Sequence, residues 1–306
     1  MPPSGFYAHA TVLMRSLLFV PADGGRKLDK AMASGADAVI VDLEDSIAPE
    51  GKVAARRSVA DFLKDACKAE SRPRLLVRVN AIATGLIDDD LAAVVPAQPD
   101  SIMLPKAEGG AGVIHADAKL AAHEALAGVE DGSITILAIA TETATALFLA
   151  GTYCGASPRL IGLTWGAEDL SAELGAEANR DAEGRFLDPY RLARSLCLAG
   201  AAAAQVPALD TVTPDFRNAK LLQREAEAAR RDGFVGKMAI HPAQVPVINE
   251  VFTPNAQAVA KARAIIAAFE ANPGKGTVAV EGVMHDRPHL ARARQLLAQA
   301  SAAGLL

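Results

Sequence analysis

The chain has 306 residues, of which 51% are hydrophobic and 22% are charged, so it holds enough apolar side chains for a large folded core. Aromatic residues make up 4% and the formal net charge is −5, which argues against a nucleic-acid surface built from a basic stripe with stacking side chains. Cys67, Cys154 and Cys197 form no CxxC pair and suggest no disulfide framework, which favours a reducing cytoplasm. The apolar run 17–20 is too short for a signal peptide core or a membrane span, so we expect neither.

Eight short apolar runs alternate with segments of helical patterning. The runs lie at 16–20, 38–42, 74–78, 101–104, 134–140, 160–164, 208–212 and 237–240. Helical segments between them include 54–69, 114–127, 189–205 and 218–232. Eight βα units close most economically into a (β/α)₈ TIM barrel. A doubly wound open sheet is the alternative, but no GxGxxG motif follows the first run.

The predicted barrel spans residues 15–253, between two extensions. Residues 1–14 are expected to form a flexible N-terminal extension. Residues 254–306 should form a C-terminal extension with one helix near 256–271, a short run at 277–283 and a final helix from about Pro288. A tail of this length either packs under a barrel or reaches over an active site, and we expect it to reach over the active site of its own or a neighbouring subunit.

Two acidic residues stand where a buried strand passes into a helix. Glu142 follows the fifth apolar run and Asp169 follows the sixth, 27 positions later, which fits one βα unit. The two carboxylates should therefore meet at the carboxyl edge of neighbouring parallel strands, where barrel enzymes place their chemistry. Such a pair can hold Mg²⁺, which commonly takes one or two protein carboxylates and leaves its other positions to water and substrate. The alternative is that both acids cap helices or pair with nearby cations.

Further charged residues follow the second, third and fourth strands. These are Asp42, Glu44, Asp45, Arg78 and Lys106. Several acids packed at one barrel mouth repel one another unless a cation or a substrate joins them, which favours a metal site with supporting acids. The planar guanidinium of Arg78 suits a carboxylate or a 2-oxo acid, and its alternative role is a salt bridge to Asp42 or Glu44.

Other features near strand ends have two interpretations each. Arg15 precedes the first strand, and Arg26, Lys27 and Lys30 lie in the helix after it; they either bind the phosphates of a nucleotide-bearing substrate or form a solvated surface. His241, after the eighth strand, is either a proton carrier or a structural residue. The glycines between 109 and 112 lack the Lys-Ser/Thr of a phosphate-binding loop, so a βα turn is expected there.

Seven motifs in chain order carry a resemblance to a known family. They are Arg15-Ser-Leu-Leu-Phe-Val-Pro21, Gly35-Ala-Asp-Ala-Val-Ile-Val-Asp-Leu-Glu-Asp45, Val77-Arg-Val-Asn80, Met103-Leu-Pro-Lys106, Glu142-Thr-Ala, Trp165-Gly-Ala-Glu-Asp-Leu170 and Gly236-Lys-Met-Ala-Ile-His-Pro242. With these motifs the chain resembles the citrate lyase beta-subunit and malyl-CoA or citramalyl-CoA lyase family, within the HpcH/HpaI aldolase superfamily.

The resemblance implies a Mg²⁺-dependent barrel enzyme that makes or breaks the carbon–carbon bond of a 3-hydroxyacyl thioester. By this resemblance, Glu142 and Asp169 hold the metal, and Arg78 binds the 2-oxo acid. Asp286 is the proton carrier, donated by a neighbouring subunit of a homotrimer or dimer of trimers. The segment Glu281-Gly-Val-Met-His-Asp286 keeps this aspartate but departs from the family pattern Asp-Gly-x-Met-Ile-Asp at Glu281 and His285.

The expected function is the cleavage or condensation of a short acyl-CoA such as malyl-, methylmalyl- or citramalyl-CoA. Substrate-binding residues are expected to be Arg78, Glu142, Arg15, Lys27 and Lys106. Three different functions stay open beside it: a citrate lyase beta subunit acting on citryl-acyl carrier protein, a metal-dependent pyruvate aldolase, and a non-catalytic thioester-binding or assembly protein.

Overall fold

The structure is a computed structural model that describes residues 13–306. Residues 14–249 form one compact unit, and residues 250–306 belong to a second. Apart from residues 13 and 14, the predicted N-terminal extension lies outside the described residues. From residue 13 onward, no helix is long and apolar enough to cross a membrane.

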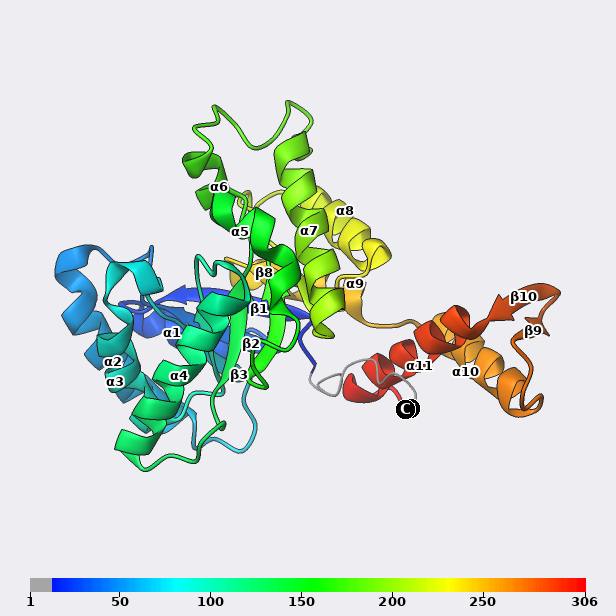
Figure 1. The fold of residues 1–306 in the computed structure, drawn as a ribbon, viewed down its shortest axis with the longest axis horizontal. Coiled ribbons are helices and arrows are strands. Elements are labelled where there is room, and N and C mark those ends of the chain that lie inside the picture. The colour runs from blue at the N-terminus through cyan, green and yellow to red at the C-terminus, as the bar shows by residue number, and fades with distance from the viewer. Residues whose placement is uncertain (1–12) are drawn as a thin grey trace. The chain divides into compact units, whose positions relative to one another are not determined.

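The first unit is a closed barrel of eight parallel strands (Figure 1). The strands are β1 (Ser16–Pro21), β2 (Ala38–Asp42), β3 (Arg74–Arg78), β4 (Ser101–Leu104), β5 (Thr135–Ile139), β6 (Leu160–Thr164), β7 (Ala208–Asp210) and β8 (Gly236–Ala239). Each strand pairs with its sequence neighbour, and β8 pairs with β1. The predicted TIM barrel is therefore confirmed.

Helices follow the strands and cover the outside of the barrel (Figure 1). The α-helices are α1 (Gly25–Met32), α2 (Lys52–Ala66), α3 (Ile87–Val94), α4 (Gly109–Ala127), α5 (Ala144–Leu149), α6 (Glu168–Glu173), α7 (Asp188–Ala204), α8 (Ala219–Asp232) and α9 (Val245–Phe252). Short 3₁₀ helices are η1 (Pro49–Gly51), η2 (Ile82–Thr84), η3 (Val95–Ala97), η4 (Ala150–Tyr153) and η5 (Pro242–Gln244).

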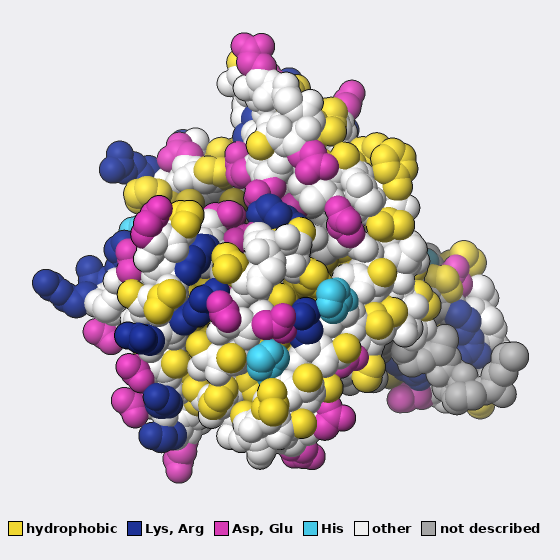
Figure 2. All heavy atoms as spheres, turned by 60° about the vertical axis from the view of Figure 1, so that its left-hand side comes forward, with side chains coloured by type: hydrophobic (Ala, Val, Ile, Leu, Met, Phe, Trp, Pro, Cys, Tyr) yellow, Lys and Arg dark blue, Asp and Glu magenta, His cyan; other side chains and the backbone are white. Residues whose placement is uncertain are grey.

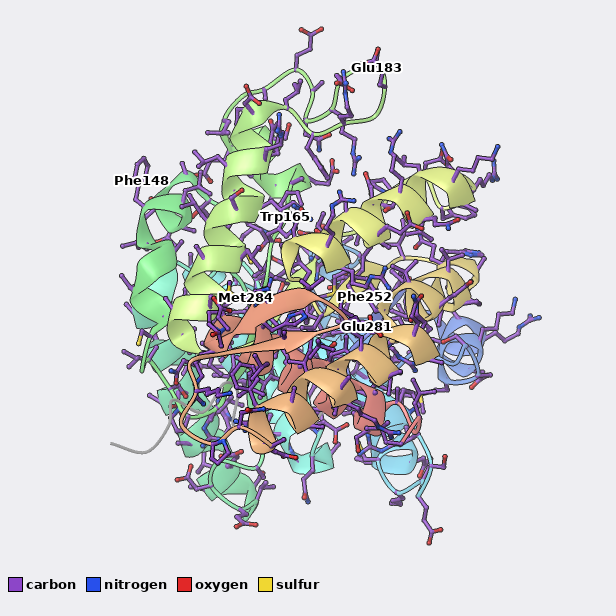
Figure 3. All side chains as sticks on the ribbon, turned by 90° about the vertical axis from the view of Figure 1, so that its right-hand side faces the viewer. Phe148, Trp165, Glu183, Phe252, Glu281 and Met284 are labelled. Carbon is purple, nitrogen blue, oxygen red and sulfur yellow. The ribbon has the colours of Figure 1, made fainter. Side chains whose placement is uncertain are left out.

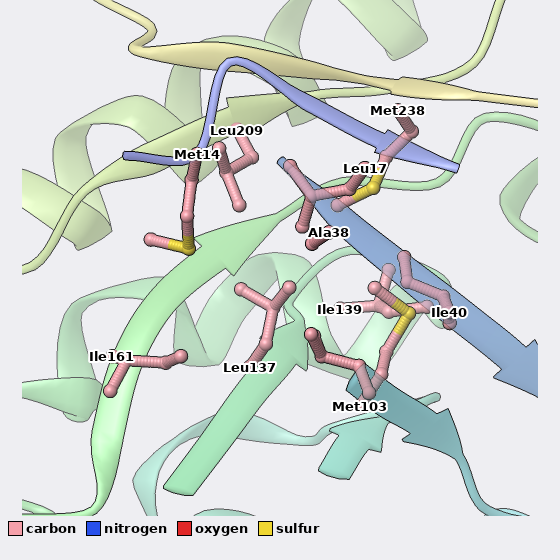
Figure 4. Close-up of a cluster of buried hydrophobic side chains, with 11 residues drawn as sticks. Met14, Leu17, Ala38, Ile40, Met103, Leu137, Ile139, Ile161, Leu209 and Met238 are labelled. Carbon is pink, nitrogen blue, oxygen red and sulfur yellow. The ribbon is translucent and has the colours of Figure 1, made fainter. Parts of the chain in front are cut away.

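Apolar side chains from alternate strand positions fill the barrel interior (Figure 4). Leu17 from β1, Ile40 from β2, Leu137 from β5 and Met238 from β8 all belong to this cluster and are buried. The strands carry apolar residues on both faces because helices cover the side that does not face the interior. This packing explains why the strand sequences read as continuous apolar runs.

Two close contacts depend on glycine. A Cβ atom at Gly236 would lie 1.8 Å from the carbonyl oxygen of Met14, so β8 approaches β1 only because this residue has no side chain. A Cβ atom at Gly110 would lie 2.3 Å from the carbonyl oxygen of Thr152, which belongs to η4. The glycines at the start of α4, expected in a βα turn, instead form its first turn, where they allow a close contact with η4.

The second unit contains two helices and a β-hairpin. Its elements are α10 (Ala256–Glu270), β9 (Thr277–Val280), β10 (Val283–Asp286) and α11 (Arg287–Ala302). Strands β9 and β10 pair antiparallel, and the run predicted at 277–283 is thus split between them. The turn uses Glu281 and Gly282, both with positive φ. Ile265, Phe269, Val278 and Leu290 form a small core within this unit.

Candidate active site

A cavity of about 460 Å³ opens at the carboxyl ends of the barrel strands. Apolar side chains on its wall include Phe19, Ile139 and Met238, and polar ones include Asp42, Asp45, Arg78, Glu142 and Asp169. On the face seen in Figure 2, Lys, Arg, Asp and Glu side chains are interspersed, without a stripe of one sign. The barrel thus concentrates charge of both signs around one cavity at the end where this fold places active sites.

Glu142 is a buried acid of this cavity. It follows β5, is 3% exposed, and its Oε2 accepts a hydrogen bond of 2.6 Å from the backbone N–H of Lys106. Burial, with the nearby negative charge of Asp169, raises the pKa of Glu142 to about 8. A Cβ atom at Gly166 would lie 2.8 Å from Cγ of Glu142, so glycine at this position makes room for the carboxylate side chain.

Lys106 joins the acids of three strand ends. Its Nζ lies 2.7 Å from Oε1 of Glu44 and 3.1 Å from Oδ1 of Asp169. Burial favours the neutral amine, but the hydrogen bond and negative charge of Glu44 outweigh it and raise the pKa of Lys106. Lys106 is therefore a cation held among acids, with its backbone bound to Glu142 and its side chain to Glu44 and Asp169.

Arg78 presents a planar fork to Asp42. Its Nε and Nη2 donate hydrogen bonds of 2.7 Å to Oδ1 and Oδ2 of Asp42. Its Nη1 lies 3.1 Å from Oε2 of Glu44 and 3.2 Å from Oδ2 of Asp45. Burial alone would raise the pKa of Asp42, yet the hydrogen bonds and charge of Arg78 hold that pKa below its usual value. The salt bridge that the sequence suggested is present, and Arg78 lines the cavity as well.

The donor set suits a hard divalent cation. Glu142 and Asp169 supply carboxylate oxygens on one cavity, and their mutual repulsion contributes to the raised pKa of Glu142. Among residues 13–306, no group of three or more His, Cys, Asp and Glu side chains is arranged to hold a metal. Two carboxylates with remaining positions left to water and substrate are the usual surroundings of Mg²⁺. Magnesium thus fits these residues.

Two basic residues that the sequence suggested for substrate binding lie away from the cavity wall. Arg15 stands at the amino end of β1, where its Nη2 pairs with Oδ1 of Asp37 at 2.8 Å, so the barrel does not bring it to the mouth. Lys27 is exposed in the first turn of α1, beyond the carboxyl end of β1. Of the two, only Lys27 is on the cavity's side of the barrel.

The two residues considered as proton carriers both cap helices. Nδ1 of His241 accepts a hydrogen bond of 3.1 Å from the backbone N–H of Ala243 at the start of η5. Asp286 belongs to the second unit, at the start of α11, where its Oδ1 accepts the backbone N–H of His289 at 3.3 Å and lies 2.5 Å from the His289 Nδ1. The hydrogen bond from the His289 ring lowers the pKa of Asp286, so its carboxylate is charged at neutral pH.

A buried polar group supports one wall of the cavity and was missed by the sequence analysis. Trp165, the only tryptophan of the chain and labelled in Figure 3, lines the cavity. Its Nε1–H donates to Oδ1 of Asp210 at 2.8 Å. The other carboxylate oxygen of Asp210 accepts a 2.8 Å bond from Nζ of Lys237, which is 0% exposed. The sequence signal that could have revealed this group was a charged residue in each of two otherwise apolar strands, Asp210 in β7 and Lys237 in β8.

Comparisons with known proteins agree with this geometry. Residues 15–242 match the HpcH/HpaI aldolase/citrate lyase family, and residues 193–305 match a family of carbon–carbon bond lyases of the TIM-barrel fold. The chain is 37% identical to a citrate lyase subunit beta-like protein of Mycobacterium tuberculosis over 286 residues, 94% of this chain and 95% of that protein. It is 36% identical to a (3S)-malyl-CoA thioesterase of Cereibacter sphaeroides over 301 residues, 96% of this chain and 97% of the relative.

A solved structure shows the same likeness. The protein CitE of Mycobacterium tuberculosis, crystallised with magnesium, acetoacetate and coenzyme A, superposes with a TM-score of 0.73 at 35% identity. The match covers 95% of this chain and 99% of that structure. Sequence motifs, barrel topology and these relatives together show that the chain belongs to the HpcH/HpaI aldolase/citrate lyase family of carbon–carbon bond lyases.

Proposed function

We propose that the chain is a Mg²⁺-dependent lyase that cleaves or forms a short 3-hydroxyacyl-CoA such as malyl-, methylmalyl- or citramalyl-CoA. The products of cleavage are a 2-oxo acid and an acetyl-CoA-type thioester. The observation that carries this proposal is the acid pair of buried Glu142 and half-buried Asp169 on the same cavity as Arg78. The CitE relative was crystallised with a metal, a short oxo acid and coenzyme A, which supports the same ligand classes here. All three cysteines are free thiols, which supports a reducing cytoplasm as its setting.

Each charged residue of the mouth takes a part in this proposal. Glu142 and Asp169 hold the metal, which when bound draws electron density from the oxygens of the oxo acid. Arg78 is oriented by Asp42, and its Nη1, which lies beside Glu44 and Asp45 on the cavity side, would contact the oxo acid. Glu44 and Asp45 balance the charge of this guanidinium.

Two lysines complete the proposed substrate contacts. Lys106 neutralises a substrate carboxylate, because its ammonium lies 3.1 Å from Asp169, which lines the cavity. Lys27, with its exposed neighbours on α1, is suited to the phosphates of the coenzyme.

Cleavage requires two proton movements. The substrate hydroxyl loses its proton, the electrons of the carbon–carbon bond move to the thioester, and the enolate carbon must then gain a proton. We assign the last step to Asp286, which must carry a proton in order to give it to the enolate carbon, and which in the condensing direction removes the same proton as a carboxylate. The lowered pKa of Asp286 favours this charged form. The C-terminal extension would supply Asp286 to the site of a neighbouring subunit in a homotrimer or dimer of trimers.

A cleavage assay on purified hydroxyacyl-CoA thioesters, with MgCl₂ or with EDTA, tests the proposal. We expect Mg²⁺-dependent release of a 2-oxo acid together with a shorter acyl-CoA. Release of free coenzyme A with the intact hydroxy acid would instead indicate thioester hydrolysis, which the name of the Cereibacter relative suggests for that protein.

The same assay, with a wider set of substrates, distinguishes a lyase of acyl-CoA from three different functions. Activity only on citryl-acyl carrier protein would favour a citrate lyase beta subunit, and activity on free pyruvate adducts would favour an aldolase. No turnover of any substrate, together with thioester binding, would favour a binding protein.

Subunit mixing tests the assignment of Asp286. Asp286→Asn should keep metal binding and thermal stability, because Asn also caps helices well, yet lose turnover by about 10²- to 10⁴-fold. Mixed oligomers of Asp286→Asn and Glu142→Gln chains should regain activity at interfaces where the intact Glu142 of one chain meets the intact Asp286 of another. If verified mixed oligomers show no recovery, Asp286 does not act across subunits.

A further inference from the structure

Lys106 has an uncommon backbone conformation for a residue with a side chain. Its φ is 47°, in the left-handed region that non-glycine residues rarely adopt. In this conformation its backbone N–H donates to Glu142 at 2.6 Å while its side chain reaches Glu44 and Asp169. One residue thus contacts both proposed metal ligands, through two different groups.

The charges around this ammonium explain the arrangement. Glu44 and Glu142 are buried, and Asp169 lies at the same cavity, so these carboxylates repel one another when no cation lies between them. Arg78 pairs with Glu44, but its other two nitrogens are engaged by Asp42. Among the residues that the structure describes, Lys106 alone has a cationic group within ion-pair distance of Asp169.

We propose that Lys106 is a built-in counter-ion of this acid cluster and that Mg²⁺ displaces its ammonium from Asp169. This inference rests on the proposed metal site. The two cations compete for the same carboxylate, since an ammonium and a divalent cation repel each other at such short range. Displacement leaves Lys106 paired, because its 2.7 Å contact with Glu44 does not involve Asp169. Metal binding would therefore release the Lys106 ammonium from Asp169 and make its charge available to the substrate.

The structure offers a matched control. Lys52 also lies at this edge, where its Nζ donates at 2.7 Å to the carbonyl oxygens of Leu43 and Glu44 and to Oδ1 of Asn80. These three hydrogen bonds stabilise the loop after β2 and involve neither Glu142 nor Asp169. Removal of Lys52 should thus affect the fold of this loop without removing a competitor for the metal.

The test is calorimetric titration of the full-length protein with MgCl₂ alone, combined with thermal unfolding in EDTA and in saturating MgCl₂. Lys106→Met should bind Mg²⁺ about three- to tenfold more tightly than wild type. Its melting temperature should fall in EDTA, because the acids lose their counter-ion, and return close to the wild-type value in MgCl₂. Lys52→Met should bind Mg²⁺ within twofold of wild type and lose the same melting temperature in both conditions.

A second variant covers a failure of Lys106→Met to fold. Lys106→Asn removes the charge with a residue that tolerates positive φ, and the same gain in Mg²⁺ affinity is expected. Unchanged or weaker Mg²⁺ binding by a folded, uncharged variant would overturn the role of Lys106. If the proposed metal site is itself wrong, wild type, Glu142→Gln and Asp169→Asn should instead give the same calorimetric titration with MgCl₂.

Discussion

The substitution Glu142→Gln should stabilise the metal-free protein and remove its response to Mg²⁺. In the folded chain the pKa of Glu142 is about 8, raised from a usual value of 4.5 first by burial and then by the charge of Asp169. Between these two values the folded state holds a proton that the unfolded state has lost. The free energy of unfolding contributed by this group therefore falls as the pH rises, by about 1.4 kcal/mol per pH unit.

The magnitude follows from the pH interval. From pH 5.5 to 7.5 in EDTA, wild type should lose about 3 kcal/mol relative to Glu142→Gln, which has no proton to release. Addition of MgCl₂ should offset most of this loss, because a ligand at 100 times its dissociation constant stabilises the folded state that binds it by about 2.7 kcal/mol. The variant lacks one of the two carboxylates and should gain much less.

Thermal or urea unfolding at fixed protein concentration measures both effects. Glu168→Gln is a suitable control, since this acid also lines the cavity but its side chain is exposed. A stability difference between Glu142→Gln and wild type that stays constant from pH 5.5 to 7.5 would refute a raised pKa of Glu142. An equal gain in stability from MgCl₂ in the variant and in wild type would refute Glu142 as a metal ligand.

Three further substitutions test other contacts of the site. Arg78→Lys should lower kcat/KM by a factor equivalent to about 2 to 4 kcal/mol, because an ammonium cannot reproduce the fork; activity within a few-fold of wild type would make Arg78 structural. Gly166→Ala should weaken Mg²⁺ binding, measured by titration, since the added Cβ displaces Glu142, at an overpacking cost of about 1 to 3 kcal/mol. Asp210→Asn should cost about 3 to 5 kcal/mol of stability and shift the emission of Trp165, and an unchanged emission spectrum would show that Asp210 does not hold the indole.

Much of the barrel was predictable because buried parallel strands have a strong local signal. The ranges expected at 38–42, 74–78, 101–104 and 160–164 agree with β2, β3, β4 and β6. Strand β7 ends at Asp210, two residues earlier than expected. The hairpin of β9 and β10 was predicted as one short run, because its turn depends on a positive φ at Glu281, which has no sequence signature.

The candidate site was only partly predictable. Strand-end acids can be located by position alone, and the cavity does gather Asp42, Glu142 and Asp169. The partner of Arg15 could not be predicted, because Asp37 meets it through the pairing of β1 with β2 rather than through sequence spacing. The space that Gly166 leaves for a neighbouring side chain is likewise a property of the closed barrel.

The pairing of β1 with β8 has a consequence for how the protein is made. Leu17 and Met238 lie side by side in the finished barrel, although nearly the whole barrel sequence separates them. Until the ribosome has released β8, the first strand presents an open edge of unpaired N–H and C=O groups, which is a template for aggregation. Contacts this distant in sequence form slowly, because the long loop between them must close first. The barrel can therefore fold as one cooperative unit only late, when Gly236 allows the last strand to pair with the first.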